Sequence, residues 1–544
     1  MLLSRRELLR LFLGSGLAAA ACRTNGDRTR KPLPEGEIVG QNVSLGHKIR
    51  ENPGIITDSD FPEDKYFYKD IVIVGAGIAG LSAGYFLKKN GFENFQIIEL
   101  EKQAGGTAQS GSSGNFSFPW GAHYLPVPLP NNQPLIELLG EMQLTEGLDA
   151  KGSPIIKEQY LCREPEERIF YKGRWYEGLY LAAGASARDK QEQQKFEQLM
   201  NYWASWRDSK NRRAFTLPVA DCSDDAELKQ LDQISFADWL AGQSFQSSRL
   251  LWLCDYACRD DYGLRLDETS AWAGLFYFCS RLAEGGAESQ SFITFPEGNG
   301  RFVHYFASTL NDKITPSELA VSITQNNDYV TVTTLSEGGL RRIRCKRLIY
   351  CAPIFTASWV IKDFQKNSAF DPTDFQHNAW WVANLTLSER PQQRSPKDFP
   401  PAWDNVLYES PSLGYVSATH QSGIDYGPTV ITYYYPMGGG RDARQKLLSM
   451  EWKDLAEVCL SDLELAHPNI REITERLDIM RWGHAMISPR PRFIWSANRL
   501  DAARPLGRIH FAHTDLSGVA LFEEAFYHGR RAALEIINSL GKSG

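Results

Sequence analysis

Three glycines and a glutamate early in the chain have the types and spacing of a dinucleotide site. Gly75, Gly77 and Gly80 form the pattern G-x-G-x-x-G, with Ala79 inside it. Glycines at these places permit a tight turn, let backbone approach a pyrophosphate, and let a helix pack closely on a strand. Glu99 follows about 20 residues later, where a carboxylate accepts hydrogen bonds from ribose hydroxyls. The spacing therefore predicts a site for the diphosphate and ribose of a dinucleotide.

A second group of small residues follows this acid. Gly105, Gly106 and Thr107 again allow backbone to approach phosphate or ribityl groups, and a Gly- and Ser-rich loop with His123 comes next. A dehydrogenase that binds only nicotinamide does not need this second cluster. A bulkier dinucleotide, whose far end crosses into a second domain, does need it.

The elements around the first motif have the pattern of a βαβ unit. Residues 71–74 form a short apolar run that predicts a buried parallel strand. Residues 81–90 carry apolar side chains at helical spacing, with Gly91 placed to end the helix, and residues 95–98 predict the next strand. The diphosphate would lie at the N-terminus of this helix, among free N–H groups.

These motifs resemble the flavin-containing amine oxidase and phytoene desaturase superfamily, whose members bind FAD. The shared order is the glycine fingerprint, the acid, a Gly-Gly-x-x-x-Ser stretch at 105–110 and a Gly-Ala-His loop at 121–123. The likeness continues in a turn at 295–300 before a predicted helix at 302–310, in predicted strands at 320–323, 329–335, 342–345 and 348–351, and in closing segments at 507–515 and 524–533.

The resemblance implies an α/β fold: a discontinuous Rossmann-type FAD-binding domain with an inserted mixed α+β substrate domain. The expected divisions are an export signal at 1–22, a linker at 23–64, FAD-binding parts at 65–124, 294–355 and 491–544, and substrate-domain parts at 125–293 (mainly helical) and 356–490. Within the substrate parts, we expect helices at 192–206, 236–240 and 446–466 and strands at 380–387 and 429–435.

The resemblance also implies which residues bind FAD. The expected contacts are Gly75, Gly77, Ala79, Gly80, Glu99, Gly105, Gly106, Thr107, His123, Val321, Asp515 and Glu524. In the family, the residue matching Val321 places its backbone against the adenine, and the acid matching Asp515 binds the ribityl or phosphate region. The C-terminal segment has no nearby cysteine, so we expect FAD to be held without the covalent thioether of some relatives.

The catalytic candidates are Asn384, His420, Trp482 and His513. Many amine oxidases of this superfamily carry a lysine near the flavin N5, whereas the matching strand here has Asn384 and no lysine. Trp482 lies where relatives place an aromatic residue near the flavin, and His513 replaces a glycine usual in the family. Asp404 and His420 are candidate general bases or cation-binding groups. The structural alternatives are loop hydrogen bonds for Asp404 and His420 and core packing for Trp482.

The N-terminus has the pattern of a targeting segment. Arg5 and Arg6 lie in a stretch that resembles the twin-arginine export motif, followed by an apolar run at 11–21. That run is too short to span a bilayer, which takes about 20 apolar residues. Residues 17–22 resemble a lipoprotein signal with Cys22 as the lipidated residue; a cleaved signal and an uncleaved anchor are the alternatives. We expect the twin-arginine machinery to export the protein to the periplasm, free or anchored to the membrane.

Charge and composition indicate which kinds of ligand the protein binds. The formal net charge is −7, and no basic run occurs outside the N-terminus, so a nucleic-acid-binding function is not expected. The 14 Trp, 22 Tyr and 28 Phe suit a pocket for a flat or apolar ligand. Histidines are scattered and cysteines show no C-x-x-C pair, so no metal site is expected.

The leading prediction is an FAD-dependent oxidoreductase that oxidises an amine or related small molecule by hydride transfer to the flavin, with an unidentified electron acceptor. Two alternatives stay open. One is a carotenoid-type desaturase or isomerase acting on an apolar polyene. The other is a non-catalytic flavoprotein that serves as a scaffold or redox carrier.

Overall fold

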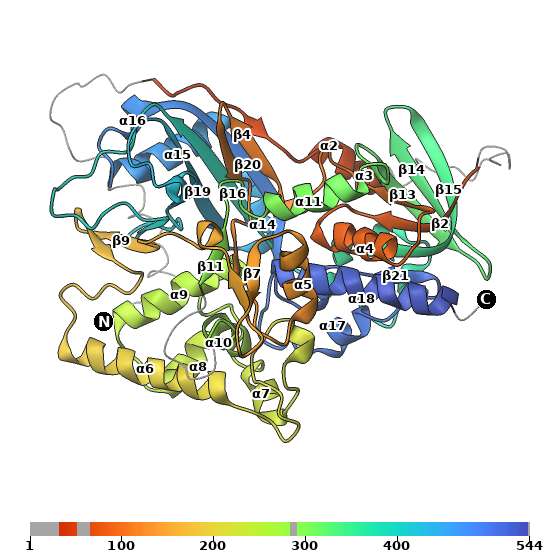
Figure 1. The fold of residues 1–544 in the computed structure, drawn as a ribbon, viewed down its shortest axis with the longest axis horizontal. Coiled ribbons are helices and arrows are strands. Elements are labelled where there is room, and N and C mark those ends of the chain that lie inside the picture. Colours follow the sequence, from red (N-terminus) through yellow and green to blue (C-terminus); the bar gives the residue numbers. More distant parts are fainter. Residues whose placement is uncertain (1–31, 52–65, 283–290, 542–544) are drawn as a thin grey trace, which may run out of the picture. The chain divides into compact units, whose positions relative to one another are not determined.

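The structure, a computed structural model, describes residues 32–51, 66–282 and 291–541 (Figure 1). The chain divides into one unit at Met1–Leu33 and a second at Pro34–Gly544, and every described helix and strand belongs to the second. The predicted export signal, with Arg5, Arg6 and Cys22, lies outside the described residues.

Among the described residues, one sheet of seven strands carries the glycine motif. Its order is β12–β3–β2–β15–β14–β13, with β21 also paired to β15. The strands are β2 (Tyr66–Val74), β3 (Phe95–Ile98), β12 (Ile314–Thr315), β13 (Leu319–Gln325), β14 (Val330–Ser336), β15 (Gly339–Tyr350) and β21 (Ile509–Phe511). β12, β3, β2, β15 and β21 pair in parallel, whereas β13 and β14 form an antiparallel extension. Segments far apart in sequence thus share this sheet, as a discontinuous nucleotide-binding domain requires.

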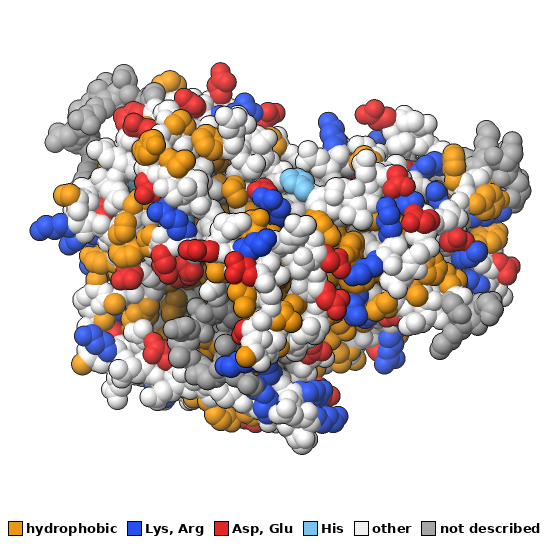
Figure 2. All heavy atoms as spheres, viewed as in Figure 1, with side chains coloured by type: hydrophobic (Ala, Val, Ile, Leu, Met, Phe, Trp, Pro, Cys, Tyr) orange, Lys and Arg blue, Asp and Glu red, His pale blue; other side chains and the backbone are white. Residues whose placement is uncertain are grey.

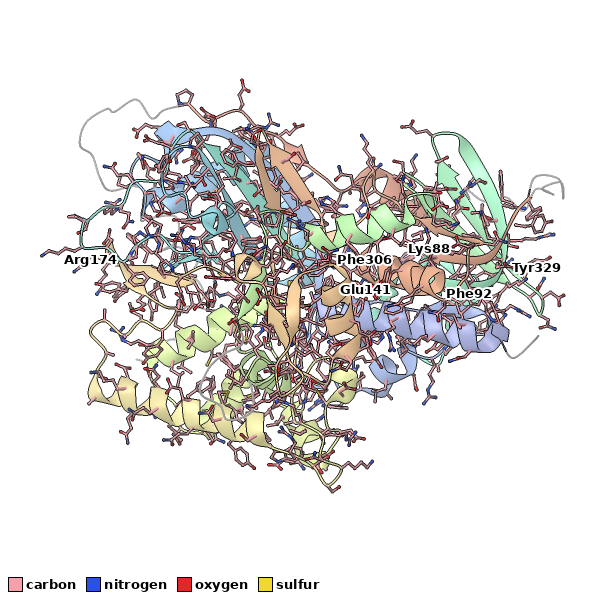
Figure 3. All side chains as sticks on the ribbon, in the orientation of Figure 1. Lys88, Phe92, Glu141, Arg174, Phe306 and Tyr329 are labelled. Atoms are coloured by element: carbon pink, nitrogen blue, oxygen red, sulfur yellow. The ribbon has the colours of Figure 1, made fainter. Side chains whose placement is uncertain are left out.

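Three helices pack around this sheet: α4 (Ile78–Lys89), α11 (Gly300–Leu310) and α18 (Phe522–Gly541) (Figure 1). The rings of Tyr85 on α4 and Phe306 on α11 lie 5.4 Å apart, and Lys88 Nζ donates to the Thr309 carbonyl. Figure 3 labels Lys88 and Phe306 where these two helices meet. α18 approaches α4 so closely that a β-carbon at Gly529 would lie 2.2 Å from the Ala79 carbonyl oxygen. A glycine is therefore required where these two helices cross.

A second sheet belongs to the predicted substrate domain. Its order is β1–β20–β16–β19–β18–β17–β9–β10. The strands are β1 (Ile38–Val39), β9 (Glu167–Tyr171), β10 (Arg174–Glu177), β16 (His377–Leu387), β17 (Asp404–Leu407), β18 (Tyr415–Ser417), β19 (Thr429–Met437) and β20 (Thr474–Ile487). β9 and β10 come from the segment predicted to be mainly helical, and β9 joins the sheet by parallel pairing with β17.

Short strands and further helices surround the two sheets. They are β4 (Ser110–Ser113), β5 (Phe116–Pro119), β6 (Tyr124–Pro126), β7 (Thr145–Leu148), β8 (Pro154–Ile156), β11 (Phe292–Thr294), α5 (Gln133–Glu141), α6 (Ala187–Ser205), α7 (Ala226–Leu231), α8 (Phe236–Gly242), α9 (Ser248–Tyr262), α10 (Ala271–Cys279), α12 (Ala357–Val360), α13 (Phe364–Asn367), α16 (Ile470–Ile473) and α17 (Ala497–Ala502). The helix predicted at 446–466 is two helices, α14 (Gly440–Ser449) and α15 (Trp452–Glu464). The break has a local cause, because Glu451 and Asp454 form a capping box that starts α15.

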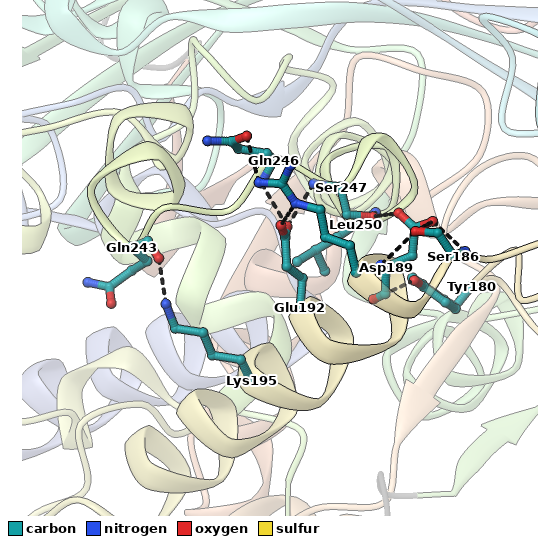
Figure 4. Close-up of polar contacts among 10 residues, drawn as sticks. Tyr180, Ser186, Asp189, Glu192, Lys195, Gln243, Gln246, Ser247 and Leu250 are labelled. Atoms are coloured by element: carbon teal, nitrogen blue, oxygen red, sulfur yellow. Dashed lines mark hydrogen bonds and ion pairs between the residues drawn. The ribbon is translucent and has the colours of Figure 1, made fainter.

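The N-terminus of α6 holds the start of α9 in place (Figure 4). Ser186 and Asp189 form a capping box on α6, and Asp189 also accepts a 2.6 Å hydrogen bond from Ser247 Oγ. One oxygen of Glu192 accepts the backbone N–H groups of Gln246 and Ser247, both at 2.7 Å. These bonds fix the direction in which α9 leaves the loop, and α9 contributes to the candidate site.

The predicted linker at 23–64 contains ordered structure where it is described. β1 pairs in parallel with β20, and the short helices α2 (Val43–Gly46) and α3 (Lys48–Glu51) follow. These residues are therefore part of the folded unit and not a flexible linker, because β1 forms hydrogen bonds with the edge strand β20.

Acidic and basic side chains are interspersed over the face shown in Figure 2. Among the described residues, no helix is both long and apolar enough to cross a membrane. The same residues hold no group of three or more His, Cys, Asp or Glu arranged to bind a metal ion, and their cysteines are unpaired and buried.

Candidate active site

The glycine motif forms the turn between β2 and α4. Gly75 has φ +102°, and a β-carbon at Gly80 would lie 1.9 Å from the Gly75 carbonyl oxygen. A β-carbon at Gly77 would meet nothing within 4 Å, so open space lies beside this residue. Within the described residues, no side chain caps α4 at Gly77, which leaves the N–H groups of the first turn for a ligand.

Glu99 follows β3 and lies against this turn. Its carboxylate accepts the N–H of Ala76 at 2.6 Å and the N–H of Glu101 at 2.8 Å. Burial raises the pKa of Glu99 to about 7, and these two hydrogen bonds oppose the rise. Each carboxylate oxygen keeps a second lone pair, so the group can still accept from a ribose hydroxyl.

The second glycine cluster lies beside the first. Gly77 and Gly105 form an isolated parallel bridge, and the Gly105 N–H donates to the Ala76 carbonyl at 2.8 Å. Gly105 and Gly106 both have positive φ, +126° and +57°. The Thr107 carbonyl accepts from Ala122 at 3.0 Å, which connects the cluster to the loop of His123. The two motifs thus form one continuous backbone surface.

Val321 and the C-terminal acids have different surroundings. A bulge between Ala320 and Ser322 places the buried residue Val321 outside the regular β13–β14 ladder. Asp515 is completely buried, and its carboxylate accepts from Ile354 N–H and His377 Nε2, both at 2.9 Å. Burial would raise the pKa of Asp515, but the imidazoles of His377 and His513 hold that pKa well below its ordinary value.

Glu524 does not line the candidate cavity. Its carboxylate accepts the Val219 N–H at 2.7 Å and the Ser517 hydroxyl, so it holds loops together. The preceding residue, Glu523, lines the cavity instead. Neighbouring residues on a helix point about 100° apart, and the sequence pattern did not distinguish the two.

A cavity of about 150 Å³ lies between the glycine-rich loops and the second sheet. Its walls are largely aromatic and aliphatic. The apolar and aromatic lining includes Tyr124, Pro126, Leu217, Tyr256, Trp380, Val382, Leu413, Val416, Tyr434, Trp482, Leu521 and Phe522. Thr107, Gly121, Ala122 and His123 form the wall that belongs to the predicted FAD-binding domain. This is the arrangement expected of a site that receives both a cofactor ring and a substrate.

Four carboxyl groups face this apolar space. Asp260 and Asp261 come from α9, Asp404 from β17 and Glu523 from α18. Burial raises the pKa of Asp260 and of Glu523 to about 7, and it raises the pKa of Asp404 well above the ordinary value. Repulsion from Asp261 adds to the shift at Asp260, and Glu167 and Asp260 add to the shift at Asp404. The cavity is therefore short of positive charge.

Of the lining residues that the structure describes, Arg281 alone carries a permanent positive charge. Its Nη2 lies 2.9 Å from both carboxylate oxygens of Asp261, so it is committed to that acid. Its guanidinium also lies 4.5 Å from the ring centroid of Tyr277. Within the described residues, no ion pair is formed by Asp260, Asp404 or Glu523, although Arg281 and Arg259 act on Asp260 at longer range. Tyr256 Oη donates to Asp404 at 3.3 Å.

His123 lines the cavity as a neutral imidazole. Burial lowers the pKa of His123 to about 4. Its ring packs against Tyr434 and Trp403, with centroids 4.8 and 5.3 Å away. It therefore does not supply the missing positive charge.

Of the four predicted catalytic residues, only Trp482 lines the cavity, and its Nε1 donates to the Trp120 carbonyl at 2.7 Å. Asn384 donates to the Pro119 carbonyl at 3.0 Å and accepts from Thr432. Its amide therefore joins the sheet to the loop.

The other two predicted catalytic residues also have structural partners. His420 Nε2 lies 2.8 Å from the Arg163 carbonyl, and His513 Nδ1 lies 3.0 Å from Asp515. Neither is on the cavity wall that the structure describes. Asp404, in contrast, is on that wall, as a cation-binding role requires.

Asn299, a residue of the cavity wall, has a buried Oδ1 with no hydrogen-bond partner among the described residues. Buried polar atoms without partners are rare, so this atom fits a ligand with a donor of its own. Together with the open space at Gly77, it fits a dinucleotide whose ring end reaches the cavity.

The comparisons with known proteins agree with this geometry. The family model for flavin-containing amine oxidoreductases matches residues 78–537. No curated protein shows significant similarity to the chain. Putrescine oxidase, in a structure of the wild type bound to putrescine, has a TM-score of 0.61 at 17% identity and covers 87% of this chain and 100% of its own.

Two further solved structures share the fold. Cyclohexylamine oxidase from Brevibacterium oxydans IH-35A has a TM-score of 0.61 at 16% identity, covering 87% of this chain and 99% of its own. A CLA-producing fatty acid isomerase from P. acnes has a TM-score of 0.59 at 15% identity, covering 88% and 99%. At these identities the structures confirm the predicted α/β fold with FAD-binding and substrate domains, and they do not decide the reaction.

The match spans most of the chain: it begins at the first residue of α4, ends in α18, and includes Glu99 and every residue that lines the cavity. Membership of the family implies a flavin cofactor and an oxidoreductase activity. The resemblance seen in the sequence is thereby confirmed: the chain belongs to the family of flavin-containing amine oxidoreductases.

Proposed function

We propose that this protein is an FAD-dependent oxidoreductase that oxidises a cationic amine. The proposal rests on the cluster of Asp260, Asp404 and Glu523 in an aromatic cavity. Among the described lining residues, Arg281 is the only Arg or Lys, and it is already paired with Asp261. An ammonium group would supply the missing charge, and aromatic walls favour cations as well as apolar chains.

In this proposal the FAD is held along the backbone surface that the two glycine clusters form. The turn at Gly75 and Gly77 and the first turn of α4 receive the diphosphate, Glu99 binds the ribose, and the Val321 backbone faces the adenine. The ring end lies toward Thr107 and the Gly121–His123 loop. When bound, FAD supplies the two-electron oxidation of the carbon next to the amine nitrogen.

The chain itself binds, orients and deprotonates the substrate. Asp260 and Glu523 hold positive charge through ionised carboxylates, and the aromatic side chains Tyr434 and Trp482 exclude water around the reacting carbon. Asp404 faces the cavity and accepts a hydrogen bond from Tyr256; the positive charge of the bound amine favours its ionised form, and the carboxylate then takes the ammonium proton. Removing that proton frees the nitrogen lone pair, which oxidation of an amine requires.

An apolar polyene or fatty acid is the second candidate. The aliphatic and aromatic walls and the fold shared with a fatty acid isomerase support it. The acidic residues of the cavity argue against this second candidate. Neither a polyene nor a fatty acid would neutralise buried carboxylates, and a fatty acid would add a further carboxylate. A non-catalytic flavoprotein gives no reason for an acidic cavity beside the predicted ring site.

An anaerobic screen tests the proposal. Purified holoprotein is mixed with aliphatic amines, amino acids, polyenes and unsaturated fatty acids, and the flavin absorbance is followed. Amines should bleach the flavin, and the Asp404→Asn variant should slow bleaching while keeping its FAD. Bleaching by polyenes alone, or by nothing, would contradict the proposal.

Export remains a separate part of the proposal. The twin arginines at Arg5 and Arg6 and the cysteine at Cys22 support transfer of the folded protein to the periplasm, where a lipid on Cys22 would anchor it to the membrane.

A further inference from the structure

The segment before the glycine motif spans the two halves of the molecule. Residues 35–39 lie along the edge strand β20: the Leu477 N–H donates to the Glu35 carbonyl at 2.8 Å, and the Ile479 N–H donates to the Glu37 carbonyl at 2.9 Å. Arg476 Nη2 also lies 2.7 Å from Glu37 Oε1. We name residues 35–46 the strap.

The strap leaves the sheet edge at a glycine that fits tightly. Gly40 has φ +92°, and a β-carbon there would lie 1.8 Å from Met480 Sδ. The backbone conformation favours glycine at this position, and any larger residue would also displace the end of the Met480 side chain. The chain can thereby turn from the substrate sheet toward the FAD-binding domain.

The far end of the strap contacts the loop that follows β3. The Asn42 N–H lies 3.0 and 2.9 Å from the two carboxylate oxygens of Glu101. Asn42 Oδ1 separately accepts the Leu45 N–H at 3.0 Å and so caps α2. A β-carbon at Gly46 would touch the Leu100 side chain at 3.5 Å, so α2 lies over the same loop.

Glu101 is the link between the strap and the predicted ribose acid. Its backbone N–H donates to Glu99 Oε1 at 2.8 Å, and its carbonyl accepts the Ser317 N–H at 2.9 Å. Glu99 needs this N–H, because burial disfavours its carboxylate and the hydrogen bond opposes that effect. A displaced Glu101 would remove one of the two backbone donors that aim the Glu99 carboxylate.

We propose that the strap is a cofactor-retention element: by holding Glu101 through the Asn42 N–H, it positions Glu99 and slows release of the dinucleotide. Asn42 and Glu101 are positioning residues, since they act through Glu99. The proposal rests on the FAD binding of the proposed function, and it adds that the substrate sheet, through β20, helps to hold the adenine end of the cofactor.

Two substitutions at Asn42 isolate the relevant hydrogen bond. Asn42→Pro removes the N–H that reaches Glu101, and the native φ of −77° is within the range of proline. It also removes the cap on α2. Asn42→Ala removes the same cap and keeps the N–H, so it is the matched control. Gly40→Val displaces the other end of the strap against Met480 without touching Glu101.

The measurement is the rate of FAD release from purified holoprotein, followed by the fluorescence of free flavin, with thermal unfolding of each apoprotein as a check on folding. Loss of a hydrogen bond to a charged group predicts about tenfold faster release in Asn42→Pro than in Asn42→Ala. Gly40→Val should also release FAD faster than the parent.

Equal release from Asn42→Pro, Asn42→Ala and the parent would overturn the proposal. Faster release from Asn42→Pro combined with unchanged release from Gly40→Val would also overturn it, because the strap would then not act as one element. A protein that takes up no FAD in any form contradicts the proposed function itself, so the two failures are distinguishable.

Discussion

The charge of the cavity makes amine binding depend on pH in a defined direction. Asp260 and Glu523 each titrate at a pKa of about 7, because burial disfavours the charged form. A bound ammonium group favours the ionised form, so binding displaces protons from these carboxyl groups. Affinity for a cationic amine should therefore increase as the pH is raised toward 7, and level off above it.

The size of the effect follows from linkage. Below pH 7, each carboxyl group that must ionise on binding weakens the affinity by up to tenfold per pH unit, about 1.4 kcal/mol. Between pH 5.5 and 7 one such group with a pKa of about 7 gives a change of roughly 16-fold, because it is half ionised at pH 7. The amine itself stays protonated over this range, since an alkylammonium titrates near the lysine value of about 10.4.

The assay is equilibrium titration of the holoprotein with an amine under conditions that prevent turnover, at several pH values, in the parent and in Asp260→Asn. The variant loses one carboxylate, so its affinity should fall and its pH dependence become shallower. The charged groups nearest Asp260 are Asp261, Arg281 and Arg259, with Tyr277 beside it, and none of these is changed. An affinity that is constant from pH 5.5 to 7.5, or that weakens as pH rises, would refute the reasoning.

Three further predictions concern other parts of the chain. Glu99→Ala should weaken FAD binding by about 1–3 kcal/mol, the scale of a hydrogen bond to a charged group; unchanged flavin content after dialysis would contradict the ribose assignment. Asp189→Ala should lower the free energy of unfolding by about 1 kcal/mol, because it removes the Asp189 half of the α6 capping box and the hydrogen bond from Ser247; urea denaturation measures this change. The hydrogen bonds from Ser247 and Ser186 lower the pKa of Asp189 to about 2, so its contribution to stability is present above about pH 4 and is lost as pH falls toward 2. Replacing Arg5 and Arg6 together by lysine should leave the protein in the cytoplasm, as cell fractionation would report; normal export of this variant would remove the twin-arginine assignment.

The nucleotide-binding unit could be predicted because its signals are local. The apolar run of β2, the glycines of the turn and Glu99 lie within one short stretch. The run forms a buried strand, the glycines make space for backbone and phosphate, and the acid binds a ribose. The predicted strand at 95–98 agrees with β3. The strands predicted at 342–345 and 348–351 are one long strand, β15, since the polar residues between them stay in the ladder.

The acidic cavity could not be predicted in the same way. Asp260 and Asp261 lie in an ordinary amphipathic helix, and Arg281, Asp404 and Glu523 come from three other segments. Only the tertiary fold brings them together, and only burial gives them unusual pKa values. Asp404 is the one acid of the cluster that stands out in the sequence, because a polar residue at the start of a strand is unusual.

The roles of Asn384 and His420 likewise depend on contacts that only the tertiary fold creates. Asn384, His420 and His513 all have close polar partners, and these partners lie far away in sequence for Asn384 and His420. Prolines and polar residues before the glycine motif predict a linker, but two residues of β1 suffice to pair with the edge of β20, and so short a strand has no pattern in the sequence.

The most direct test of the acidic cavity is anaerobic reduction of the purified flavoprotein by a simple aliphatic amine, compared between the parent and Asp404→Asn. The cavity predicts that the amine bleaches the parent flavin and that the variant, with its FAD content unchanged, is reduced far more slowly. A parent flavin that stays oxidised with every amine, or a variant as fast as the parent, would contradict the role assigned to the buried carboxyl groups.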